Sequence, residues 1–132
     1  MNTRFIIISL LILTFLFGCV TAATRIHRSK IAEKAKTELI GKSKAEILSC
    51  AGAPASKDTS GKLEFLSYMS GNKLGKVDKQ KKLPEDTRYC EVTFVFENDN
   101  VIDILYTGRT GARSSKDEQC AFVVEKCMSE ND

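Results

Sequence analysis

The sequence has no tryptophan, only two prolines and a single histidine, His27. A lone histidine with no nucleophile near it in the chain disfavours the Ser-His and Cys-His catalytic arrangements. A strong charge of one sign is also lacking, because the formal net charge is only +3. Nucleic-acid-binding domains carry a much stronger basic footprint. The glycines form no phosphate-binding loop. We therefore expect a protein that is not an enzyme, binds no nucleic acid and needs no cofactor or small-molecule substrate.

The composition is that of a globular protein, with 42% apolar and 28% charged residues in 132 positions. This length suits one domain, and the apolar content argues against a disordered chain. No internal repeat is visible. We expect a signal peptide over residues 1–18, a tether over 19–23, a folded domain over 24–128 and a short tail over 129–132.

The N-terminal segment has the form of an export signal. Arg4 precedes an uncharged run over residues 5–17, which matches the charged and apolar regions of a secretory signal peptide. The run ends in Leu-Phe-Gly-Cys19, which resembles the lipobox of bacterial lipoproteins. The resemblance implies cleavage before Cys19 and acylation of its thiol and new amino group. Val20 follows the cysteine where an Asp could stand, and in this the chain resembles lipoproteins sent to the outer membrane. We expect a lipid anchor on the periplasmic face of that membrane.

Two other interpretations of this segment remain open. Small residues over 20–23 suit ordinary signal peptidase, which would release a soluble periplasmic protein. Alternatively, residues 5–23 are uncharged and nearly long enough to span a bilayer as an uncleaved anchor. Arg25, Arg28 and Lys30 follow directly, and such positive flanks tend to stay on the cytoplasmic side.

Two helices are predicted at the start of the domain. Over residues 24–40, Ile31, Ala35 and Leu39 recur every four positions, which is typical of an amphipathic helix. The stretch GKSKAEILSCAGAP over 41–54 then contains a capping box, Ser43 with Glu46, and ends with a glycine and a proline. We expect a short helix over 43–51 that pairs tightly with the first.

Three strands and a last helix follow. Residues 55–62 have the composition of a turn-rich connection, and residues 63–69 have β character with Leu63, Phe65, Ser67 and Met69 on one face. Residues 90–97 alternate apolar and polar, 98–100 form a turn, and 101–107 return as a strand with Ile102, Ile104 and Tyr106 inward. Asp117 is a suitable N-cap for a helix to residue 128. The predicted fold is α+β: a two-layer sandwich of two N-terminal helices on a three-stranded antiparallel meander, plus a C-terminal helix.

Four cysteines follow Cys19, namely Cys50, Cys90, Cys120 and Cys127. An even number in an exported chain favours two disulfides. On one unbroken helix, Cys120 and Cys127 would lie about 10.5 Å apart along the axis, beyond the ~7 Å that a disulfide allows. Each would then pair with Cys50 or Cys90. If the helix is broken, the pairs Cys120–Cys127 and Cys50–Cys90 become possible. The four cysteines could instead bind zinc. Structural zinc sites usually contain closely spaced cysteine pairs, and none occurs here, so we expect no metal.

A lysine-rich loop is the remaining surface feature. It lies between the first two predicted strands, and five lysines in it are candidate contacts for anionic lipid headgroups: Lys73, Lys76, Lys79, Lys81 and Lys82. The alternative is a solvated loop kept soluble by its charge.

The order of these motifs resembles one known family. The GKSKAEI stretch with its later Gly-x-Pro, the Phe-Leu-Ser-Tyr segment and the Val-Thr-Phe-x-Phe strand are similar to the SmpA/OmlA domain of BamE-like envelope lipoproteins. The resemblance covers roughly residues 41–107, and the four mature cysteines and the last helix depart from it. It implies a non-enzymatic interaction or scaffold module in outer-membrane assembly or integrity, with an unidentified envelope protein as partner. The alternative is a soluble periplasmic inhibitor or ligand-binding protein.

Overall fold

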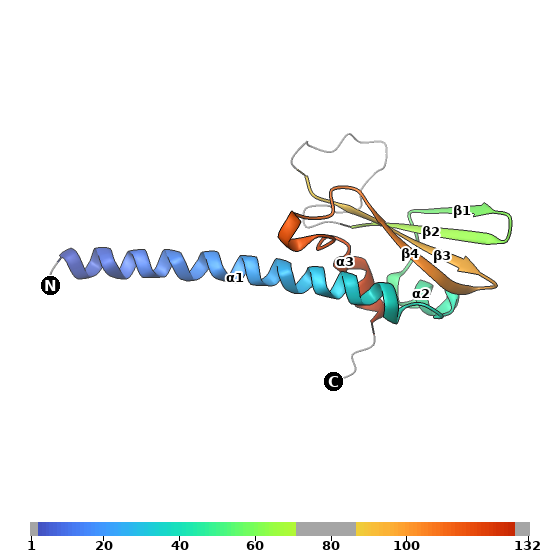
Figure 1. The fold of residues 1–132 in the computed structure, drawn as a ribbon, viewed down its shortest axis with the longest axis horizontal. Coiled ribbons are helices and arrows are strands. Elements are labelled where there is room, and N and C mark those ends of the chain that lie inside the picture. The colour runs from blue at the N-terminus through green and yellow to red at the C-terminus, as the bar shows by residue number, and fades with distance from the viewer. Residues whose placement is uncertain (1–2, 71–86, 129–132) are drawn as a thin grey trace.

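The computed structural model describes residues 3–70 and 87–128, with side chains from Thr21 onward. The five lysines of the predicted lipid-contacting loop lie outside the described residues. Helices α1 and α2 precede an antiparallel sheet in the order β1-β2-β3-β4, and short helical turns close the chain (Figure 1). The predicted α+β class with an antiparallel meander is confirmed.

The first helix, α1 (Thr3–Glu38), starts well before the predicted position 24 and passes through Cys19 without a break. Its N-terminal part projects away from the rest of the molecule (Figure 1). The predicted stripe is confirmed, because Ala32, Ala35 and Leu39 are fully buried. Over the part of the chain that the structure describes, no helix is long and apolar enough to cross a membrane.

The second helix, α2 (Lys44–Ala51), has the predicted capping box. The Ser43 hydroxyl accepts the backbone N–H of Glu46 at 3.3 Å, and the Glu46 carboxylate accepts the Ser43 N–H at 2.8 Å. The tight pairing expected between α1 and α2 is not their main contact. Both helices pack mainly on the C-terminal turns. The reason lies in the link between the helices. The N–H of Gly41 donates to Val101 and the N–H of Val101 donates to Lys42, so the link joins the sheet edge instead.

The sheet has four strands, not the three predicted. β1 (Ser56–Ser60) pairs antiparallel with β2 (Leu63–Ser70) through a two-residue turn in which Gly61 has φ +60°. That geometry suits a type II′ hairpin turn with glycine first. β1 has no apolar residue, so it lacks the alternation that reveals a half-buried strand. The β1 strand forms because its backbone pairs with that of β2.

β3 (Cys90–Glu97) and β4 (Asn100–Thr107) form the predicted hairpin, and Asn98 and Asp99 in the turn have positive φ. The prediction that Ile102 points inward is wrong, because its side chain is 45% exposed. The register shifts between Val95 and Phe96, which leaves Ile102 as the extra residue of a β-bulge. The bulge turns Val101 inward, beside the same core as Ile104.

The predicted continuous helix over 117–128 is also wrong. Asp117 has φ +62°, whereas an N-cap residue adopts an extended conformation. The chain instead makes the 3₁₀ turn η1 (Arg113–Ser115), an irregular turn, a single turn α3 (Ala121–Val124) and the 3₁₀ turn η2 (Glu125–Cys127). The predicted inward face holds, since Cys120, Val123, Val124 and Cys127 are all buried.

The core lies between the helices and one face of the sheet. Phe94 is its central aromatic residue, in edge contact with Tyr68 at 5.7 Å between ring centroids. The sheet contributes the following core side chains: Leu66, Tyr68, Cys90, Val92, Phe94, Phe96, Val101 and Ile104.

Candidate functional site: a disulfide-braced domain with an open sheet face

Two disulfides join the four cysteines of the domain. Cys50 pairs with Cys127 and Cys90 with Cys120, with Cα–Cα distances of 5.0 and 5.1 Å. Of the two outcomes that the sequence left open, the structure shows the one in which Cys120 and Cys127 do not pair with each other, although the last helix is broken. Because all four sulfur atoms are in disulfides, none is a thiolate ready for zinc. In the described part of the chain, His, Cys, Asp and Glu side chains form no group that could hold a metal ion.

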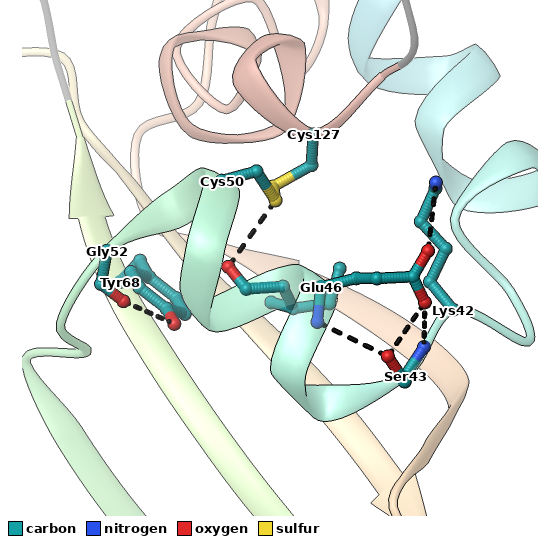
Figure 2. The surroundings of a disulfide bond; sticks show 8 residues. Lys42, Ser43, Glu46, Cys50, Gly52, Tyr68 and Cys127 are labelled. Carbon is teal, nitrogen blue, oxygen red and sulfur yellow. Dashed lines mark hydrogen bonds and ion pairs between the residues drawn. A yellow bond between two sulfur atoms is a disulfide. The ribbon is translucent and has the colours of Figure 1, made fainter.

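The Cys50–Cys127 bond ties α2 to η2 (Figure 2). It lies in the last turn of α2, close to Gly52, whose carbonyl accepts a hydrogen bond from the Tyr68 hydroxyl at 3.1 Å. Helix α2 is thus fixed at its start by its own cap, at its end by β2 and from above by the C-terminal turn. Cys50 is half-buried in this arrangement.

The Cys90–Cys120 bond lies deeper, since both cysteines are fully buried. It ties the start of β3 to the residue before α3. Nearby, the Ser70 hydroxyl donates to the Gln119 carbonyl at 2.6 Å. The C-terminal segment is therefore clamped to the sheet at one end and to α2 at the other.

The opposite face of the sheet is left without a helix among the described residues. The strand register places Phe65 beside Val95, and Ser67 beside Thr93, on this open face. The Ser67 and Thr93 hydroxyl oxygens are 2.8 Å apart and share a hydrogen bond. Val95 on the inner strand is 5% exposed, whereas Leu105 on the edge strand is 44% exposed. The apolar side chains of the open face are Leu63, Phe65, Met69, Val95 and Leu105.

Carboxylates border this apolar patch. Asp58 pairs with Phe65, Glu91 with Met69, Glu97 with Leu63, and Asp103 with Val95. Paired residues share a face of the sheet, so all four acidic side chains belong to the open face. By the same register, no strand residue on that face is basic. The open face therefore combines a buried Val95, half-buried Leu63, Phe65 and Met69 and an exposed Leu105 with an acidic border.

An ion-pair group supports the tips of the two hairpins. The Lys44 ammonium donates to Glu64 on β2 at 2.8 Å and also contacts Asp99 in the β3–β4 turn. The hydrogen bonds to Asp99 and Glu64 raise the pKa of Lys44. Together with the backbone bond from Lys44 N–H to the Asp99 carbonyl, they join α2 to the far end of the sheet.

Tyr106 fixes β4 beneath α1. Its hydroxyl donates to the Ala32 carbonyl at 2.8 Å, and the Lys36 ammonium lies 4.5 Å from the centroid of its ring. Burial of the phenol, with a smaller contribution from the charge of Asp117, raises the pKa of Tyr106 well above its usual range.

Replacing Tyr106 with phenylalanine should flatten the loss of stability at alkaline pH. The unfolded phenol titrates near pH 10, and the folded pKa is higher. The stability that Tyr106 contributes is therefore complete below about pH 10 and is lost as the pH rises toward the folded pKa. Melting temperatures measured from about pH 8 to 11 should fall less steeply for Tyr106→Phe. At neutral pH the variant should lose about 1 kcal/mol with its hydrogen bond. Parallel curves would contradict this assignment.

No protein-family model, curated protein or solved structure matches the chain. The resemblance to the SmpA/OmlA domain therefore stays a prediction. Cys19 lies on the described backbone of α1, which extends beyond the domain core. The sequence predicted the open face only in part. Leu63, Phe65, Ser67 and Met69 share a face as predicted, and that face is opposite the core. The sequence signal for the core face of β2 is the pair Leu66 and Tyr68, which alternate with these residues and suit the core equally well.

Proposed function

We propose that this protein is a non-enzymatic lipoprotein of the bacterial cell envelope, anchored through Cys19, whose small domain docks onto a partner protein. The observation that carries the docking role is the open sheet face, with its apolar side chains and acidic border. An apolar patch with a polar rim is typical of protein–protein interaction sites. A partner segment that combines apolar and basic side chains complements this surface.

Two features support the envelope location. The lipobox-like sequence before Cys19 stands at the end of an uncharged run, where a lipoprotein signal peptide would end. The two disulfides fit an oxidising compartment such as the periplasm. The loose resemblance to the SmpA/OmlA domain favours an outer-membrane location and a role in assembly or integrity of that membrane.

The anchor is tested by the intact mass of protein produced with its own leader and recovered from membranes. We expect a chain that begins at Cys19, carries acyl groups and contains two disulfides. Cys19→Ser should abolish both the acyl mass and the recovery in the membrane fraction. An unacylated chain that begins near Ala23 would refute the anchor and favour the soluble inhibitor or ligand-binding protein.

The docking face is tested by a photo-crosslinking amino acid placed at Phe65 or Leu105, with Ser49 on the exposed side of α2 as the control position. In intact cells, we expect one discrete protein adduct from the two open-face positions and none from Ser49. Reversing the charge at Glu91 and Asp103 with lysine should remove the Leu105 adduct, because the partner segment is expected to be basic. Adducts that form equally at Ser49, or that survive the charge reversal, would refute the docking face.

A further inference from the structure

The charges of the described domain are divided between its two ends. The end from which α1 projects comprises residues 21–31, 87–89 and 108–118, and it contains seven basic and two acidic residues. The rest of the described domain, over 32–70, 90–107 and 119–128, contains seven basic and ten acidic residues. The basic residues of the first group are named here the basic collar: Arg25, Arg28, Lys30, Arg88, Arg109, Arg113 and Lys116.

Tertiary contacts bring the collar together from distant parts of the chain. The Ser29 hydroxyl donates to the backbone carbonyl of Lys116, and the Arg28 guanidinium lies 4.7 Å from the ring centroid of Phe122. The turn η1, which contains Arg113, also packs on α1. Figure 1 shows this orange segment beside α1, at the side of the domain nearer the N-terminus. The collar therefore surrounds the point where α1 leaves the domain.

Little opposite charge neutralises the collar. This end of the domain has two acidic residues. One of them, Glu118, is 1% exposed and accepts a hydrogen bond from Arg88 at 3.0 Å. That leaves Asp117 as the other carboxylate of this end. The basic side chains of the collar that are exposed to solvent include Arg25, Lys30, Arg113 and Lys116. Arg109 contacts the ring of Tyr89 at 5.5 Å.

We propose that the basic collar seats the domain on the anionic headgroups of the membrane to which Cys19 is anchored. This rests on the proposed function, because the anchor sets the distance. Along the helix, Arg25 lies about 9 Å and Ser29 about 15 Å from Cys19, at 1.5 Å per residue. The near edge of the collar is thus about one screening length, ~8 Å at physiological salt, from the anchor point. Because residues 19–23 belong to α1, the helix presents the collar end of the domain to the headgroups.

The absence of tryptophan provides the test. Ser114 is exposed in η1, within the collar, and Ser60 is exposed at the end of β1, in the less basic part of the domain. Acylated full-length Ser114→Trp and Ser60→Trp are placed in vesicles of phosphatidylcholine, with or without one part in about four of phosphatidylserine. All vesicles carry a spin-labelled quencher lipid. We expect the tryptophan at position 114 to be quenched only in the phosphatidylserine vesicles. That quenching should be lost in about 1 M salt, where the screening length falls to about 3 Å. The tryptophan at position 60 should stay unquenched throughout.

A matched pair of triple variants separates the collar from net charge. Arg25, Arg113 and Lys116 to glutamine should abolish the quenching, whereas Lys34, Lys62 and Lys126 to glutamine remove the same charge elsewhere and should leave it intact. Equal effects of the two triples, or equal quenching in both vesicles, would overturn the collar. The acyl mass is measured first on the same samples. An unacylated chain refutes the anchor, and an acylated chain without quenching at position 114 refutes the collar alone.

Discussion

Removing either disulfide by a paired cysteine-to-serine change should lower the free energy of unfolding by several kcal/mol. The bonds span 77 and 30 residues. Each bond lowers the entropy of the unfolded chain by closing a loop. The resulting stabilisation at 25 °C is about 4.5 kcal/mol for Cys50–Cys127 and about 3.6 kcal/mol for Cys90–Cys120. Losses of this size approach the whole stability of a typical domain, about 5–15 kcal/mol. Either variant should therefore unfold at far lower urea concentrations.

Urea unfolding followed by circular dichroism measures both losses, and Cys19→Ser is the matched control because residue 19 lies outside the core. The control should unfold like the parent. In the folded parent, limited reductant should open Cys50–Cys127 first, since Cys50 is half-buried and both Cys90 and Cys120 are fully buried. Peptide mapping of alkylated thiols identifies the order. Paired variants as stable as the control would mean that the bonds do not brace the native domain.

Replacing Phe94 with alanine should destabilise the domain by about 3–5 kcal/mol. Its side chain is fully buried and packs against Tyr68 and Phe96, at 5.7 and 6.5 Å between ring centroids. Truncation therefore leaves a cavity that the strands on either side cannot close. The same denaturant titration measures the loss.

Phe65→Ala is the control for Phe94→Ala, with the same change on the neighbouring strand but on the opposite face. Its side chain is only half-buried, so we expect a loss of about 1 kcal/mol or less. Phe65→Ala should stay folded and lose the partner adduct formed at Leu105, which separates a binding defect from a folding defect. A loss at Phe65 as large as that at Phe94 would show that the open face is buried in the free protein.

Local features of the sequence predicted about half of the candidate site. The capping box at Ser43 and Glu46, the stripe of α1 and the alternation of β3 each depend on residues within one or two turns or one strand. Such short-range preferences act in the same way wherever the segment is placed. The even number of cysteines similarly predicted two disulfides, but it left open whether Cys120 and Cys127 pair with each other, because that depended on whether the last helix is unbroken.

The tertiary structure decided the rest, because the responsible contacts join residues far apart in the chain. β1 carries no apolar pattern and exists through its backbone bonds to β2. The bulge at Ile102 depends on the register between β3 and β4. A shift of one residue in that register moves a side chain from the inward to the outward face of the sheet. The choice of Cys127 for Cys50 depends on where η2 meets α2. The sequence by itself determined the capped helix α2, the buried stripe of α1, the strands β2 to β4 and how many cysteines pair. Only packing decided which sheet face stays open and which basic residues gather where α1 leaves the domain, since both follow from long-range contacts that no local preference encodes.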